Sequence, residues 1–212
     1  MLSDSVNCST NPFEEALSSA FGAANLSKIQ QATIGIAGAG GLGSNCAVNL
    51  VRSGFVNFVI VDFDVIEYSN LNRQFYFYNQ VGLPKVEALQ KNLLAINPNL
   101  RLDMRQTKIE ENNVEAIFER CTVIVEAFDQ ARYKKMIVEH YIHSDKLIVS
   151  ASGIAGWSNG DDLLTHKIRD NFYLVGDLSS EAGKELPPCA PRVNIAAAKQ
   201  ANIILDYIVR GA

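Results

Sequence analysis

The sequence predicts an α/β protein built on a doubly wound, mainly parallel sheet of the Rossmann type. Short apolar segments alternate with amphipathic segments of helical period through residues 28–152, which is the pattern of parallel strands joined by helices. A glycine-rich turn follows the first apolar segment, and acidic residues follow two later ones. Because ligands bind beyond the carboxyl ends of parallel strands, these residues are expected to form one site.

The first predicted strand and the turn after it indicate nucleotide binding. Residues 32–37 are mostly apolar, as a strand buried on both faces should be. The turn fits the spacing G-x-G-x-x-G, in which the glycines permit a tight turn, a close approach to phosphate and close helix packing. The following helix, about residues 42–53, directs its positive end at the same phosphate. The glycines of this turn are Gly38, Gly40, Gly41 and Gly43.

A second apolar strand, residues 58–61, ends at Asp62, which lies 19 residues after Gly43. This spacing matches the acidic residue that binds a ribose hydroxyl in dinucleotide folds. Asp64 lies close by and is expected to share that task or to orient Arg73. These features alone would also suit a nicotinamide-dependent oxidoreductase, so that alternative stays open at this point.

A polar hexamer and a lysine distinguish this chain from an ordinary dinucleotide fold. Residues 69–74 read SerAsnLeuAsnArgGln, and the aromatic run at 75–78 should anchor them to the body. Lys85 lies at the start of a helical pattern that spans residues 82–96. A lysine at that position opposes the helix dipole, so a bound anion explains its presence better than stability does.

Together these motifs resemble the adenylating enzymes that activate ubiquitin-like proteins, the ThiF/MoeB/HesA group. The resemblance runs from about residue 25 to the end of the chain. Two late stretches are most similar to the short, zinc-less form of ThiF, the sulfur-carrier adenylyltransferase of thiamine synthesis. The matching residues are 38–43, AspPheAsp at 62–64, 69–74, Lys85, AsnPro at 97–98, Asp129, GluAlaGly at 181–183 and AlaProArgVal at 190–193.

The resemblance implies ATP-dependent adenylation of the C-terminal glycine of a small ubiquitin-like sulfur carrier protein that is ThiS-like and ends in Gly-Gly. Arg73 and Lys85 would supply positive charge, and Asn70 and Gln74 would position the phosphates. Asp129 would hold Mg²⁺, a hard cation that takes carboxylate and phosphate oxygens. A second alternative is a non-catalytic subunit that binds a ubiquitin-like protein, which would be expected to lose Arg73, Lys85 or Asp129.

The remaining segments complete the alternating pattern and divide the chain into three parts within one compact domain. These are an N-terminal tail and helix at 1–27, the ATP-binding Rossmann-like region at 28–152, and a small C-terminal carrier-binding lobe at 153–212. The lobe is expected to contain an antiparallel strand at 165–169, a mobile crossover loop at 176–191, and a closing helix from Pro191 onward. Further strands are expected at 100–106, 121–127 and 147–151, and helices at 13–26, 111–119 and 132–143.

Composition sets the expected partners and compartment. The net charge of −4 and the pI of about 5.4 give no basic field for nucleic acid. No apolar run reaches the roughly 18 residues of a membrane span, and the N-terminus lacks the pattern of a signal peptide. We therefore expect a cytoplasmic protein. The N-terminal apolar helix is expected to cover the body or a second subunit, and with the family resemblance it suggests a homodimer.

The cysteines and histidines show no spacing of metal ligands. No C-x-x-C pair occurs, so no structural zinc is expected. Cys46 and Cys121 are interpreted as small buried hydrophobes, and Cys189 as an incidental loop thiol. The histidines, at 140, 143 and 166, are interpreted as surface or packing residues. No Arg or Lys precedes Lys28, whereas many relatives carry an N-terminal arginine that reaches the nucleotide of a partner subunit.

Overall fold

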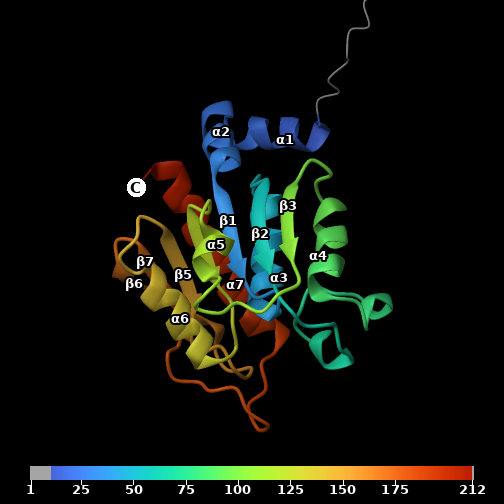
Figure 1. Ribbon diagram of the computed structural model, residues 1–212, viewed down its shortest axis with the longest axis vertical. Coiled ribbons are helices and arrows are strands. Elements are labelled where there is room, and N and C mark those ends of the chain that lie inside the picture. Colours follow the sequence, from blue (N-terminus) through green and yellow to red (C-terminus); the bar gives the residue numbers. More distant parts are fainter. Residues whose placement is uncertain (1–10, 212) are drawn as a thin grey trace, which may run out of the picture.

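The computed structural model describes residues 11–211 and confirms the predicted fold class (Figure 1). One seven-stranded sheet has the order β3-β2-β1-β4-β5-β7-β6. Every neighbouring pair is parallel except β6 and β7, which pair antiparallel. The strands are β1 Thr33–Ala37, β2 Asn57–Val61, β3 Arg101–Arg105, β4 Val123–Glu126, β5 Leu147–Ala151, β6 Leu164–Arg169 and β7 Phe172–Gly176.

Helices cover both faces of the sheet and bury two apolar layers. Helices α2, α3, α4 and α7 contribute to one buried cluster, and α5 and α6 contribute to the other. The two sides are visible in Figure 1, where α5 and α6 lie in front of the sheet. The helices are α1 Pro12–Phe21, α2 Ala23–Gln31, α3 Gly41–Arg52, α4 Lys85–Leu94, α5 Val114–Phe118, α6 Ala131–Tyr141 and α7 Ala190–Arg210.

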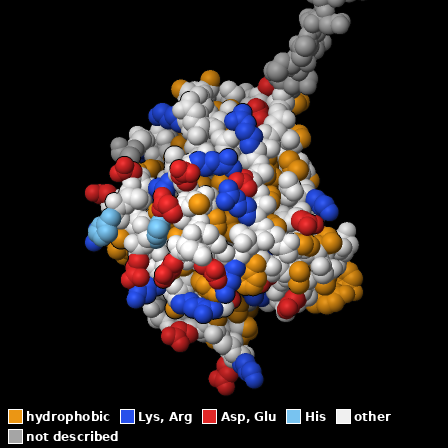
Figure 2. All heavy atoms as spheres, viewed as in Figure 1, with side chains coloured by type: hydrophobic (Ala, Val, Ile, Leu, Met, Phe, Trp, Pro, Cys, Tyr) orange, Lys and Arg blue, Asp and Glu red, His pale blue; other side chains and the backbone are white. Residues whose placement is uncertain are grey.

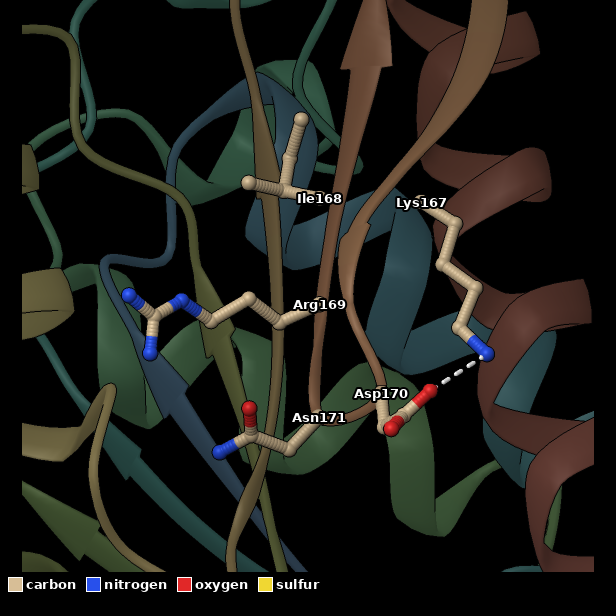
Figure 3. A pocket seen from close by; sticks show the side chains of 5 residues that line it. All are labelled: Lys167, Ile168, Arg169, Asp170 and Asn171. Carbon is tan, nitrogen blue, oxygen red and sulfur yellow. Dashed lines mark ion pairs between the residues drawn. The ribbon is translucent and has the colours of Figure 1, made fainter.

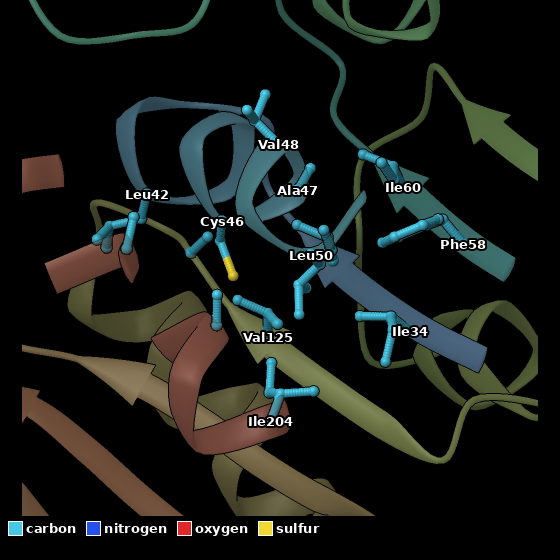
Figure 4. Packing of buried hydrophobic residues seen from close by; sticks show 14 of the residues in the cluster. Ile34, Leu42, Cys46, Ala47, Val48, Leu50, Phe58, Ile60, Val125 and Ile204 are labelled. Carbon is cyan, nitrogen blue, oxygen red and sulfur yellow. The ribbon is translucent and has the colours of Figure 1, made fainter. Parts of the chain in front are cut away.

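The core is centred on α3, which packs against the sheet and against α7, a helix that also contacts the sheet (Figure 4). Cys46 and Leu50 of α3 are fully buried beside Val125 of β4 and Ile204 of α7. The helix can approach the first strand this closely because residue 43 is glycine. A Cβ atom there would lie 1.8 Å from the Gly38 carbonyl oxygen, so the packing role predicted for Gly43 has a direct steric cause.

Two segments differ from the sequence prediction. The single helix expected at 13–26 is two helices, because Gly22 adopts φ 80° and breaks the chain between α1 and α2. Their apolar side chains Leu17 and Leu26 are buried against the body of the same chain, beside Gly54. The N-terminal segment therefore covers its own domain.

The second difference is β7, for which no strand had been expected. A five-residue apolar run beside a turn does not reveal which strand it pairs with. In the structure β7 lies between β5 and β6, and it pairs parallel with β5. The C-terminal part of the chain thus extends the main sheet, and α7 returns across it to pack on α3. The antiparallel strand expected at 165–169 is confirmed as β6.

The tip of the β6–β7 hairpin frames an open hollow, which Figure 3 shows from close by. Its lining comes from one exposed hairpin, residues 167–171, and the side chains point in different directions. The ion pair between Lys167 and Asp170, at 2.9 Å, is the polar contact drawn there. No helix in the part of the chain described by the structure is long and apolar enough to cross a membrane.

Candidate nucleotide site

A cavity of about 580 Å³ opens at the carboxyl ends of the parallel strands. Its lining combines the glycine turn after β1, the ends of β2, β4 and β5, and part of the 176–191 loop. Nine of the eleven residues predicted for the site line it together. They are Gly38, Gly40, Gly41, Asp62, Asp64, Arg73, Gln74, Lys85 and Asp129.

Asp62 holds the glycine turn in place. One carboxylate oxygen accepts a hydrogen bond from the Ala39 N–H at 2.7 Å, and the other accepts from the Asp64 N–H at 2.8 Å. The Tyr76 hydroxyl donates to the Ala39 carbonyl at 2.7 Å from the opposite side. Burial raises the pKa of Asp62, while Lys85 and the two backbone donors act in the opposite direction.

Lys85 is buried and paired with Asp64. Its Nζ lies 2.7 Å from Asp64 Oδ2, and its side chain is 8% exposed whereas that of Asp64 is 46% exposed. The two residues are also joined through the backbone, where the Lys85 N–H donates to the Asp64 carbonyl at 3.0 Å. Asp64 thus orients Lys85 at the N-terminus of α4, where the ammonium faces the cavity without support from the helix dipole.

The polar hexamer brings a second cation to the same cavity. Arg73 Nη1 donates to the Ser69 carbonyl at 3.0 Å and to Asn72 Oδ1 at 2.7 Å. The Asn45 amide of α3 donates to the Arg73 carbonyl at 2.8 Å and so fixes the hexamer to the glycine helix. Gln74 is buried, and its Oε1 has no hydrogen-bond partner among residues 11–211, so a ligand or a water molecule would satisfy it.

The other two predicted residues do not line the cavity. Gly43 lies in the first turn of α3, where it permits the packing described above. Asn70 ends the short 3-10 helix η1, Tyr68–Asn70, and its Oδ1 accepts from the Glu67 N–H at 3.0 Å. Within this structure Asn70 shapes the loop that carries Arg73. A direct role for Asn70 in positioning phosphate stays a prediction.

Asp129 has the chemistry of a magnesium ligand. Its carboxylate lines the cavity on the turn between β4 and α6 and is exposed. One carboxylate together with phosphate oxygens fits Mg²⁺, which keeps several waters and seldom uses a full protein cage. Among residues 11–211, no group of three or more His, Cys, Asp or Glu side chains could hold a metal ion. The expected lack of a structural zinc stays a prediction.

Three charged side chains near the cavity were not assigned from the sequence. Glu126 is the last residue of β4 and is fully buried. Lys134 of α6 lies 3.1 Å from it and also lines the cavity. The sequence does contain a signal for Glu126, because it is an acid at the end of an apolar strand, as Asp62 is. The predicted strand ran to residue 127, so Glu126 lay inside it and was not considered a strand-end acid. Asp177, the third, directly follows β7 and lies near the start of the 176–191 loop.

Arg192 anchors that loop from the first turn of α7. Its guanidinium is buried and lies 2.5 Å from Asp177 Oδ2, with further hydrogen bonds to Ser158 Oγ at 3.0 Å and the Asn159 carbonyl at 2.7 Å. The other oxygen of Asp177 accepts from the backbone of Ser179 and Ser180. Burial raises the pKa of Asp177, but these hydrogen bonds outweigh it and lower the pKa to about 2.

Cys46 and Cys121 are buried as predicted, and burial raises the pKa of both thiols, that of Cys121 to about 11. Cys189 precedes α7, and its thiol lies 3.5 Å from the Pro187 carbonyl. None of the three histidines lines the cavity. Lys28 does not line the cavity, and its ammonium donates to the Val209 carbonyl at 2.9 Å.

Cys189→Ser is expected to leave nucleotide-dependent chemistry unchanged. The thiol does not line the cavity, and activation of a carboxylate by ATP requires no thiol. The test is ATP–pyrophosphate exchange by the variant, with the melting temperature as a control for folding. Loss of exchange in a folded variant would give the thiol a function.

The fold and the site define a Rossmann-like α/β protein in which two cations and a carboxylate line the same cavity as a glycine-rich turn. The chain belongs to the ThiF family, whose model matches residues 14–167. It is 38% identical to ubiquitin-like modifier-activating enzyme 5 of Caenorhabditis elegans over 82 residues, which is 39% of this chain and 20% of that protein. It is 32% identical to a probable molybdopterin-synthase adenylyltransferase of Porphyra purpurea over 121 residues, or 57% of this chain and 32% of that protein.

The chain therefore spans a third or less of these curated relatives. Among solved structures, the fold is similar to that of E. coli tRNA N6-threonylcarbamoyladenosine dehydratase in complex with ATP, with a TM-score of 0.84 and 18% identity. That alignment covers 92% of this chain and 93% of the solved one. The likeness confirms the architecture across nearly the whole chain.

Proposed function

We propose that this protein adenylates the C-terminal glycine of a small ubiquitin-like carrier protein with ATP. The observation that carries the proposal is the convergence of Arg73, Lys85 and Asp129 on the cavity that also contains the glycine turn. An oxidoreductase would need the glycine turn and Asp62 but has no use for two cations at the phosphate end. A non-catalytic binding subunit would not be expected to keep them.

In the proposed reaction a carboxylate oxygen of the carrier attacks the α-phosphorus of ATP. The new acyl–phosphate bond forms as the bond from that phosphorus to the pyrophosphate oxygen breaks, and pyrophosphate leaves. The difficulty is bringing two anions together and stabilising charge as it develops on the phosphoryl oxygens. Lys85 and Arg73 provide that positive charge from fixed positions, so little reorganisation is needed when the bond breaks.

The other residues position the nucleotide. The turn from Gly38 to Gly41 presents backbone N–H groups and the start of α3 to the phosphates. Asp62 would bind the ribose hydroxyls, and Gln74 would position a phosphate or the water beside it. Mg²⁺, when held by Asp129 and phosphate oxygens, would neutralise charge on the nucleotide.

The carrier we propose is a ThiS-like sulfur carrier that ends in Gly-Gly and serves the thiazole branch of thiamine synthesis. Support comes from the resemblance of residues 181–183 and 190–193 to the short form of ThiF. The relatives named above act on other partners according to their names, a ubiquitin-like modifier and molybdopterin synthase. Comparing exchange rates with carriers of the thiamine, molybdopterin and ubiquitin-like types would identify the preferred partner.

The direct test of adenylation is carrier-dependent exchange of radiolabelled pyrophosphate into ATP by the purified protein. We expect exchange with a Gly-Gly carrier and none with a carrier that lacks its last glycine. A protein that binds NAD in preference to ATP and shows no exchange with any carrier would support the oxidoreductase instead.

The 176–191 loop is proposed to cover the carrier tail. Ser180, Glu181 and Pro188 line the cavity, so the loop already borders the space that an extended tail would enter. Its two ends are held by Asp177 and by hydrogen bonding of Gly156 to the Pro187 carbonyl, whereas residues 181–186 are exposed. Covering the tail would exclude water and protect the acyl-adenylate from hydrolysis.

Limited proteolysis should report this closure. The loop is expected to be cut within residues 181–186 in the free protein and with ATP alone, and to be protected when carrier and ATP are both bound. Cleavage at the exposed β6–β7 hairpin serves as the internal control and should not change. Unchanged cleavage of the loop in a sample that forms adenylate would show that another segment covers the tail.

We further propose that the protein forms a homodimer through the connection between β2 and α4. Figure 2 shows hydrophobic side chains gathered over this connection, at the lower right of the molecule. Two of its exposed rings, those of Tyr68 and Tyr78, lie 5.4 Å apart. Exposed apolar side chains that gather in one patch often mark a protein–protein contact. The residues are Phe63, Val65, Tyr68, Phe77 and Tyr78.

Sedimentation at micromolar concentration is expected to give a dimer. Tyr78→Glu, which places a charge on the most exposed ring of the patch, should shift the protein toward monomer. Trp157→Glu is the matched control, because Trp157 is nearly as exposed as Tyr78 but lies between β5 and β6. A wild-type protein that sediments as a monomer would count against the dimer.

A further inference from the structure

A buried charged cluster lies beneath the floor of the cavity, and the proposed adenylation does not use it. Glu126, at the end of β4, has no exposed surface. Its carboxylate accepts hydrogen bonds from Lys134 Nζ at 3.1 and 3.2 Å, from the Phe128 N–H at 2.7 Å, and from Ser150 Oγ. A buried carboxylate is costly unless it is paired in this way, so the arrangement needs an explanation.

Lys134 connects three elements at this point. It lies in the first turns of α6, contacts Glu126 of β4, and donates to the carbonyl of Ala151, the last residue of β5, at 2.9 Å. Although its side chain borders the cavity, its ammonium protons are directed at these acceptors. Lys134 therefore fixes the start of α6 to the strand ends.

The turn that this cluster supports carries Asp129. Residues 127–130 join β4 to α6, and Glu126 holds the backbone of Phe128, directly before Asp129. Lys134 holds the helix that begins directly after Gln130. Both ends of this turn are therefore held by the buried cluster. The Asp129 side chain itself is exposed, and no hydrogen bond to residues 11–211 orients it.

We propose that Glu126 and Lys134 are positioning residues that orient Asp129 to receive the magnesium–ATP complex. The inference rests on the proposed function for the presence of ATP and Mg²⁺ in this cavity. A site with a single protein carboxylate depends on how well that carboxylate is placed. Changes to groups that orient a metal ligand typically cost about 10–100-fold in metal affinity or activity.

ATP affinity, measured by calorimetry with excess Mg²⁺ and again with EDTA, tests the inference without any carrier. Lys134→Met is expected to lose about tenfold in affinity with Mg²⁺ and less than about twofold with EDTA. Lys134→Arg, which can keep the ion pair, should retain most of the Mg²⁺-dependent affinity. Lys135→Met is the matched control, because Lys135 is its exposed neighbour and pairs with Glu139 on the helix surface.

Glu126→Gln provides an independent variant if Lys134→Met does not fold, since it keeps the shape of the side chain and one acceptor oxygen. The same selective loss with Mg²⁺ is expected. Equal losses in Mg²⁺ and EDTA, unchanged affinity in both, or a wild-type affinity that does not depend on Mg²⁺ would each overturn the inference. Failure of the carrier-dependent exchange, with this binding pattern intact, would reject only the proposed reaction.

Discussion

Lys85→Met is expected to reduce carrier-dependent exchange by about 100-fold or more, which corresponds to a few kcal/mol of transition-state stabilisation. Lys85 is the most buried cation of the cavity, at 8% side-chain exposure, and Asp64 fixes its ammonium at 2.7 Å. A charge held in a poorly solvated position acts more strongly on developing phosphoryl charge than one in bulk water. Arg73→Ala should have an effect of the same order.

Folding should survive the loss of Lys85. A lysine in the first turn of α4 opposes the helix dipole, and the Asp64 carboxylate that it leaves is 46% exposed and can be hydrated. Lys91→Met, on the exposed side of the same helix, is the matched control and should exchange normally. Near-normal exchange by Lys85→Met, in protein with an unchanged melting temperature, would remove Lys85 from the catalytic site.

Asp177→Ala is expected to lower the free energy of unfolding by roughly 3–5 kcal/mol, because it leaves a buried guanidinium without its counter-charge. The Arg192 side chain is 2% exposed, and its Nε has no hydrogen-bond partner within the described part of the chain. The same change removes the acceptor for the backbone of Ser179 and Ser180. Urea unfolding measures the effect. Asp170→Asn, which removes an exposed pair with Lys167, should change the free energy little.

The contribution of Asp177 should also depend on pH. Its pKa in the folded protein is lowered to about 2, from an ordinary value of 3.8. Because the folded state binds the proton less readily, the stabilisation is present above about pH 4 and is lost as the pH falls toward 2. A difference in stability between wild type and Asp177→Asn that stays constant from pH 7 to pH 2 would contradict this account.

The parts of the fold and site that could be predicted are those governed by local pattern. The glycine spacing, the apolar strands and the acid that ends β2 each have a short-range cause, and they placed Asp62 correctly at the cavity. Lys85 was identifiable because a lysine at a helix N-terminus is unfavourable without an anion. The break at Gly22 was missed because the apolar spacing continued across it.

The parts that could not be predicted depend on contacts between distant segments. The pairing of Lys85 with Asp64 requires the chain to return after 21 residues, and that of Glu126 with Lys134 requires the turn between β4 and α6 to fold back. From the sequence alone, Glu126 only interrupts an apolar strand, and its burial is understandable only once Lys134 is known to pair with it. For Asn70, the family resemblance implied a role in positioning phosphate, which stays a prediction. Its contact with the Glu67 N–H was not foreseen.

Intact mass spectrometry of the carrier tests the central claim most directly. The purified protein is incubated with ATP, Mg²⁺ and a ThiS-like carrier ending in Gly-Gly, with inorganic pyrophosphatase added to drive the reaction forward. The account predicts that the carrier gains the mass of one AMP group, that the gain requires its terminal glycine, and that Lys85→Met slows it by about 100-fold or more. A folded, ATP-binding protein that leaves thiamine-, molybdopterin- and ubiquitin-type carriers unmodified would contradict the account.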